Sequence, residues 1–168
     1  MRLIRTAALT AATVLLAACA SGSLPLPHRL PENTAAAPWY QLTQYDAAGA
    51  PVRATLLTVA AENGGLRFVQ TDPLGAPVSR QRLHLPQGWK NDGFIPPNAA
   101  ARRVFAAVLP LMSADPAAVY PQLDYQADEH GGRFSQGRQE LWRWQNKDNG
   151  HRLTFPDGSQ WQLSPLQD

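Results

Sequence analysis

Side chains that could carry out chemistry are few in this sequence, and they are scattered. The four histidines stand at positions 28, 84, 130 and 151, and only Asp128-Glu129-His130 places one of them beside carboxylates. Consecutive residues of one turn point in different directions, so this triplet favours a solvated turn over a metal site. Asp124 and Glu140 could act as a general acid and base if a cleft paired them, but their spacing gives no reason to expect that.

The motifs of the common catalytic and nucleotide-binding sites are also missing from the sequence. It contains no G-x-S-x-G nucleophile elbow, no Walker loop, no H-E-x-x-H motif and no pair of cysteines. We therefore expect no catalytic residue, no metal and no cofactor, and a protein that is not an enzyme.

The one cysteine, Cys19, closes a short apolar run near the start of the chain. Arg2 and Arg5 precede this run, which ends in Leu16-Ala17-Ala18. Two positive charges, a short apolar core and small residues at the cut point are typical of a secretory signal. A helix that spans a membrane would need about 20 apolar residues, whereas polar and proline-rich sequence begins here at Ser21.

Residues 16–19 also resemble a bacterial lipobox, the Leu-Ala-Ala/Gly-Cys pattern of lipoprotein signals. The resemblance implies that residues 1–18 are a signal peptide and that Cys19 becomes the acylated first residue of the mature chain. Ala20 resembles the residue after the cysteine in lipoproteins sorted to the outer membrane, so the implied location is its periplasmic face. The alternative is that Cys19 stands in an ordinary signal tail by chance.

The charge of the mature chain follows from this interpretation. Loss of residues 1–18 removes two of the 15 basic residues and leaves 13, which balance the 13 acidic ones. A net charge near zero provides no long-range attraction to nucleic acid, so we expect no such partner. A chain of this size can bury one core without disulfides, and we expect a monomer.

The segment after Cys19 is rich in proline. Pro25, Pro27, Pro31 and Pro38 favour extended chain and oppose helix and sheet hydrogen bonding. We interpret residues 19–38 as a tether that could reach roughly 60 Å, and residues 39–168 as one folded domain.

Hydrophobic patterning in the domain predicts strands, then helices, then strands. The expected strands cover 39–45, 53–61, 66–71, 78–85, 122–127, 139–145, 151–155 and 160–163, with a long loop around Trp89 and a turn at 129–132. A helix capped by Asn98 is expected over 98–112, where Pro110 should kink or end it near Leu109, and a second short one is expected from Asp115-Pro116. This order predicts an α+β fold in which a strongly curved antiparallel sheet, an unclosed β-barrel, carries a helical lid contributed by the middle of the chain.

The predicted helix has a wide apolar face that includes Val104, Phe105, Val108 and Leu111. This face either packs on the sheet as plain core or closes over an apolar pocket, and periodicity cannot separate the two. Trp142 and Trp144 share one face of a predicted strand and are further candidates for lining such a pocket.

Residues 66–75, with the strand at 78–85, are similar to the third strand, Asn-Pro-Leu-Gly turn and fourth strand of the outer-membrane lipoprotein receptor of the lipoprotein localisation (Lol) pathway. The chain also resembles an uncharacterised lipoprotein family found beside aryl-polyene and fatty-acid-type gene sets. The resemblance implies a LolA/LolB-like unclosed barrel with an apolar cavity for acyl chains, and a periplasmic carrier as partner. It further implies that Leu74 protrudes and helps to deliver cargo to the membrane. The turn here begins with Asp72 instead of Asn, and the body is shorter.

Three functional hypotheses remain at this stage. The first is a lipid-anchored module that accepts acyl chains or lipidated cargo and aids their delivery to the outer membrane. The second is a structural or assembly lipoprotein that docks another envelope protein, and the third is an acyl-handling enzyme. In the first hypothesis Leu74 contacts the membrane; otherwise it would be an ordinary turn residue that folds back on the sheet.

Overall fold

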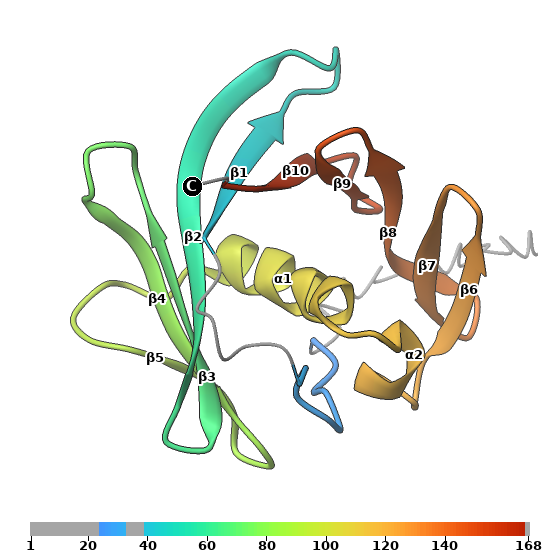
Figure 1. Cartoon of the computed structure of the whole chain (residues 1–168), viewed down its shortest axis with the longest axis horizontal. Coiled ribbons are helices and arrows are strands. Elements are labelled where there is room, and N and C mark those ends of the chain that lie inside the picture. The colour runs from blue at the N-terminus through green and yellow to red at the C-terminus, as the bar shows by residue number, and fades with distance from the viewer. Residues whose placement is uncertain (1–23, 33–38, 167–168) are drawn as a thin grey trace, which may run out of the picture.

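A computed structural model describes residues 24–32 and 39–166, and within them ten strands form one antiparallel sheet around a central helix (Figure 1). The strands are β1 (Trp39–Tyr45), β2 (Pro51–Glu62), β3 (Gly65–Thr71), β4 (Pro77–His84), β5 (Gly88–Asn91), β6 (Asp124–Asp128), β7 (Gly131–Gln136), β8 (Gln139–Lys147), β9 (Gly150–Thr154) and β10 (Gln160–Pro165). Between β5 and β6 lie α1 (Ala99–Val108), the 3₁₀ helix η1 (Leu109–Met112) and α2 (Pro116–Val119). In this described part of the chain, none of the helices has the length and hydropathy needed to cross a membrane.

The sheet consists of two five-strand meanders that meet where the first and last strands pair. Its strand order is β5-β4-β3-β2-β1-β10-β9-β8-β7-β6, so β5 and β6 are the two edges. The sheet curves around α1, which lies on its concave side, and the edges stay apart (Figure 1). The predicted curved, unclosed antiparallel sheet with a helix from the middle of the chain is therefore confirmed.

Helix α1 begins and ends at the residues that the sequence indicates. The side chain of Asn98 accepts a hydrogen bond from the backbone N of Ala101 at 2.9 Å and caps the first turn. Pro110 has no N–H to donate to the carbonyl of Ala106, four residues earlier. The Tyr120 hydroxyl donates to that carbonyl instead, at 2.9 Å. Burial raises the pKa of Tyr120, so the hydroxyl stays protonated and continues to donate.

Two aromatic clusters flank α1 inside the sheet. On the side of the first meander, the rings of Phe68 and Phe105 stack with centroids 5.0 Å apart, and Trp89 packs against both. On the side of the second meander, Tyr120 meets Phe134 and Trp142 edge-on. One continuous core therefore joins the helix to both halves of the sheet.

Two strands were missed in the sequence, and both begin at a glycine. We predicted a turn over 129–132, but the turn ends at His130 and Gly131 and Gly132 belong to β7. A Cβ on Gly131 would lie 2.0 Å from the carbonyl oxygen of Trp144, and one on Gly132 would lie 2.5 Å from its ring. These glycines therefore permit close approach instead of forming a turn. In the same way, the predicted loop around Trp89 contains β5, which begins at Gly88.

Residues 24–32, which we expected to form part of an extended tether, lie against the body. They run through the gap between the two edges of the sheet, as the blue segment of Figure 1 shows. The backbone N of His28 donates to the carbonyl of Val119 at 2.9 Å, and the amide of Gln122 donates to the carbonyl of Leu26 at 2.7 Å. We call these residues the N-terminal segment.

Apolar contacts also hold the N-terminal segment against the body. Pro27 and Pro31 are buried, and Leu30 packs against the core. Toward the other edge, a Cβ on Gly88 would come within 3.1 Å of the Leu26 side chain. The signal peptide, Cys19 and the remainder of the predicted tether lie outside the described residues.

Candidate functional site

The turn between β3 and β4 displays Leu74 to solvent. Its side chain is 95 % exposed, so the alternative in which it folds back on the sheet does not occur in this structure. One carboxylate oxygen of Asp72 accepts hydrogen bonds from the backbone N of Leu74 at 2.9 Å and of Ala76 at 2.8 Å. Gly75 provides the positive φ of 88° that the turn requires. The backbone of the turn is therefore fixed by hydrogen bonds, whereas the Leu74 side chain makes no contact that would explain a leucine at this position.

The turn between β1 and β2 provides an internal control for this position. Asp46 accepts from the backbone N of Ala48 and of Ala50, both at 2.9 Å, and Gly49 has a φ of 82°. The backbone hydrogen bonds of the two turns also correspond, because Asp46 pairs with Ala50 as Asp72 pairs with Ala76. The position of Leu74 is taken by Ala48 in this turn. The backbone conformation therefore does not require a leucine there.

A polar layer separates Leu74 from the apolar core. Thr55, Gln70, Ser79 and Gln81 are the buried polar residues of the described chain, and all lie on β2, β3 and β4. Gln70 donates to the Thr55 hydroxyl at 2.9 Å, and Gln81 donates to the carbonyl of Asn98 at 3.0 Å. Gln70 and Ser79 lie opposite each other between the turn and Phe68, so Leu74 is not an outlying part of the core.

The helix residues proposed to line a cavity are packed as core. Val104, Phe105 and Val108 are at most 2 % exposed and belong to the same apolar cluster as the inner face of the sheet. Leu111 is half-buried against that cluster. Five pockets of the described chain open at the surface, and none of these five is lined by Val104, Phe105, Val108 or Leu111. The interior around α1 is thus filled by its own side chains.

The two tryptophans both pack against Phe134 but otherwise have different neighbours within this core. Trp142 packs on Tyr120, whereas Trp144 stacks on Tyr125 with ring centroids 5.7 Å apart. No hydrogen-bond partner for the buried Nε1 of Trp142 is found among the described residues. Both rings also border shallow surface pockets. They act in this structure as core residues of the second meander.

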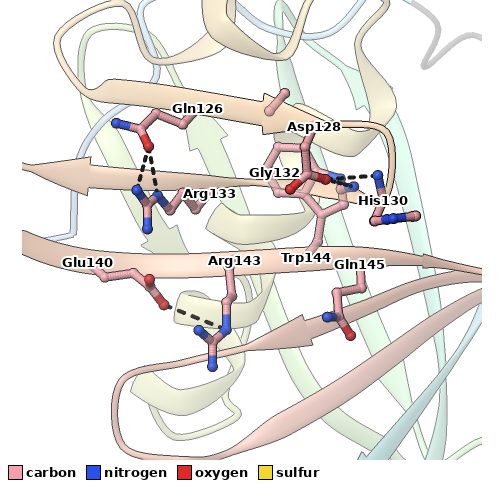
Figure 2. A pocket seen from close by; sticks show the side chains of 11 residues that line it. Gln126, Asp128, His130, Gly132, Arg133, Glu140, Arg143, Trp144 and Gln145 are labelled. Carbon is pink, nitrogen blue, oxygen red and sulfur yellow. Dashed lines mark hydrogen bonds and ion pairs between the residues drawn. The ribbon is translucent and has the colours of Figure 1, made fainter.

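The pocket in Figure 2, of about 470 Å³, lies open over strands β6, β7 and β8. Its polar groups are occupied with one another, since the Arg133 guanidinium donates to Gln126 and Arg143 lies 3.8 Å from Glu140. Asp128 accepts from the backbone N of His130 at 2.8 Å, and so holds the exposed turn expected at the Asp128-Glu129-His130 triplet. This arrangement offers an open polar groove and brings no nucleophile together with a base.

Phe94 is an exposed apolar residue that sequence reasoning missed. Its side chain is fully exposed in the loop between β5 and α1. The sequence contained a signal, because Asp92-Gly93-Phe94 repeats the order of Asp72-Pro73-Leu74: an aspartate, a turn residue and a large apolar residue. Both tips are also followed by proline, at 77 and at 96.

Comparisons of the chain with family models and with curated proteins add nothing to the resemblance described above. No family model matches the chain, and no curated protein matches it either.

Proposed function

We propose that this chain is a non-enzymatic outer-membrane lipoprotein that accepts an acyl chain or lipidated cargo between its sheet and α1 and aids delivery to the outer membrane. The observation that carries the proposal is the display of Leu74 on a rigid turn. The resemblance of residues 66–85 to the Lol receptor, the lipobox-like residues before Cys19 and the unclosed curved sheet support it.

The presence of a leucine at position 74 is explained if its side chain contacts an apolar phase outside the molecule. Burial of a leucine side chain is worth roughly 1.5–3 kcal/mol, and the folded chain forgoes that gain at this position. The corresponding turn carries Ala48 with the same hydrogen bonds, so neither strain nor turn chemistry selects the larger side chain. Contact with a bilayer or with the acyl chain of a cargo would recover the lost burial.

Entry of an acyl chain requires the N-terminal segment to move. The interior is filled, and this segment covers the gap between the edges β5 and β6. It is held there by two hydrogen bonds, at His28 and Gln122, and by the apolar contacts of its prolines and Leu30. In the proposed mechanism the segment leaves the gap, α1 shifts away from the sheet, and the acyl chain takes the place of their apolar side chains.

Uptake of a fluorescent fatty acid by the full chain tests this mechanism. Wild type should bind the probe, and Gln122→Ala should bind it faster because the bond to the Leu26 carbonyl is lost. Gln126→Ala is the matched control, since Gln126 is exposed on β6 and hydrogen-bonds to Arg133 only. If neither wild type nor Gln122→Ala takes up the probe, the chain has no acyl-binding function.

A second candidate is a structural lipoprotein that docks another envelope protein. The filled core favours it, since Val104, Phe105 and Val108 leave no space for a ligand as the chain stands. A photo-reactive residue at position 74 separates the two functions in cells. Adducts with lipid or lipidated cargo support delivery, whereas adducts with one envelope protein, together with absent fatty-acid uptake, support docking.

A further inference from the structure

The turns of the sheet alternate between two ends, and the apolar tips gather at one of them. In an antiparallel meander, successive turns lie at opposite ends of the sheet. The turns at 46–50 and 72–76 and the loop at 92–98 therefore share one end with those at 137–138 and 156–159. We call this the Leu74 end. The opposite end carries the turns at 63–64, 85–87, 129–130 and 148–149.

The two ends differ in what their turns expose. Val52, Leu74 and Phe94 are exposed large apolar residues, and all three belong to the Leu74 end. The turns of the opposite end carry none, and their exposed tips include Asn63, Glu129, His130, Asp148 and Asn149. Trp39 at the start of β1, Leu166 after β10 and Leu26 beside Gly88 are also exposed and lie at the opposite end, but none of them is on a turn.

The loop that carries Phe94 is anchored on both sides of its tip. Asp92 lies 2.7 Å from Nε of Arg67 and 3.2 Å from Nε of Arg82, and its backbone N donates to the carbonyl of Arg80 at 3.0 Å. The Asn91 side chain donates to the carbonyl of Ile95 at 3.3 Å, across the tip. Phe94 is therefore presented in a defined position, as Leu74 is by Asp72.

We propose that the Leu74 end is a membrane-docking surface in which Leu74 inserts into a bilayer that carries anionic headgroups and Phe94 enters the same bilayer less deeply. This rests on the proposed function at Leu74 and adds a second insertion residue and the class of lipid. Each tip is a single convex protrusion flanked by proline, a shape that a fluid phase can surround more readily than the face of a folded protein.

The charges behind the tips complement an anionic surface. Arg53, Arg80 and Arg102 belong to this end, and none forms a salt bridge with a described residue. Arg80 lies four residues behind Ala76, about 13 Å along the strand, which places its guanidinium near headgroup level when Leu74 reaches the hydrocarbon. Among the nearby acids, Asp92 is paired with two arginines, whereas Asp72 accepts backbone N–H groups and keeps its charge. Basic residues at such a depth strengthen binding to anionic lipid.

An environment-sensitive fluorophore on introduced cysteines tests the docking surface. The full chain is reconstituted into vesicles of zwitterionic lipid with one-third anionic lipid, with Leu74→Cys, Phe94→Cys or, at the opposite end, Asn149→Cys. Wild type is labelled in parallel to subtract any signal from Cys19. Labels at 74 and 94 should shift to the blue and be quenched by lipids brominated in their acyl chains, whereas the label at 149 should report water.

Substitution of the second tip measures its contribution. With the label at position 74, Phe94→Ser should lower the ratio of docked to undocked molecules about tenfold or more. Ala47→Ser, an exposed position on another turn of the same end, is the matched control and should leave the ratio unchanged. Vesicles without anionic lipid should also lower it, because Arg53, Arg80 and Arg102 then lose their counterpart.

Three results would overturn the proposal. If the label at 94 reports water as the label at 149 does, Phe94 is not an insertion residue, even if position 74 inserts and the proposed function stands. Equal docking on purely zwitterionic vesicles would show that the surface does not need anionic headgroups. If the labels at both tips report water in a chain that still takes up fatty acid, the Leu74 end does not insert into a bilayer, and a protein partner remains as its occupant. Insertion of both tips in a chain without fatty-acid uptake would instead reject the proposed function and leave the docking surface standing.

Discussion

The two meanders of the sheet share α1 and a common core, yet they are built differently. The first, β1–β5, holds all the buried polar side chains of the described residues, displays apolar tips and carries on its outer face the ion pairs of Arg67 and Arg82 with Asp92. The second, β6–β10, is filled with aromatic rings and has polar turns. We interpret the second meander as the main source of stability and the first as the half that, in the proposed function, gives up stability for contacts outside the molecule.

The strongest test of this division is removal of a ring from the second meander. Trp142→Ala should lower the free energy of unfolding by about 3–5 kcal/mol, because the ring is 1 % exposed and a large cavity would remain. Urea denaturation measures the change. Trp39→Ala, at a half-exposed tryptophan of β1, is the control and should cost far less. Trp142→Phe should recover much of the loss, since it also removes an indole N–H without a partner.

A smaller loss of stability is expected from Tyr120, the aromatic residue of the second meander's side that hydrogen-bonds to α1. Tyr120→Phe leaves the Ala106 carbonyl without a donor, because Pro110 cannot replace the hydroxyl, and should cost about 1–3 kcal/mol.

This substitution also has a defined pH dependence. Burial raises the pKa of Tyr120 above its ordinary value of 10, so the unfolded chain releases this proton first as pH rises. Wild type should therefore lose stability above pH 10 more steeply than Tyr120→Phe. Denaturation curves measured from pH 8 to 11 would contradict the assignment if the two slopes were equal.

The ion pair between Arg103 of α1 and Asp157 of the β9–β10 turn should contribute less to the free energy of unfolding than Tyr120 does. Burial alone would raise the pKa of the Asp157 carboxyl, but hydrogen bonds from Ser159 and Arg103 hold it at about 2. Because this pKa is depressed, the stability it provides is present above about pH 4 and is lost as pH falls toward 2. The pair is partly exposed, so Asp157→Asn should cost less than about 1 kcal/mol at pH 7. The variant should lack this acid-dependent loss between pH 4 and 2 in thermal unfolding.

The smallest effect on stability is predicted for Leu74, the residue on which the proposed function rests. Leu74→Glu should leave the melting temperature and fatty-acid uptake nearly unchanged, because the side chain contacts neither core nor strand. Transfer of acylated cargo to liposomes should nevertheless be lost. Ala48→Glu places the same charge on the matching turn and should preserve transfer. A large drop in stability for Leu74→Glu, with transfer per folded molecule intact, would remove the distinction between the meanders.

Sequence patterns predicted most of the sheet because its hairpins use residues with strong backbone preferences. The turns at Asn63-Gly64 and Asp157-Gly158 occur where their residue types place them. β7 was missed because Gly131 and Gly132 indicate a turn locally, and only the position of Trp144, distant in sequence, shows why they are needed. β5 was missed because a strand of four residues that begins with a glycine gives little periodicity.

The candidate site was predicted in part. Leu74 was found because a Pro-Leu-Gly turn is recognisable without a structure, and its exposure agrees with the protrusion expected there. Phe94 was passed over because its exposure depends on how Asp92 and Asn91 pin the loop. Whether Val104, Phe105 and Val108 face a cavity or a filled core depends on side chains from many strands, and amphipathic spacing is the same in both cases.

The pairing of β1 with β10 determines when the molecule can finish folding. Tyr40 lies opposite Pro165, so the seam between the meanders joins residues from nearly the two ends of the domain. Such non-local pairing slows folding relative to hairpin formation. Until the last strand has been synthesised, β1 remains an open edge that other chains could pair with. The hairpins of the first meander must therefore form while this edge is unprotected, and loss of the final strand would leave two unjoined half-sheets instead of a slightly shortened domain.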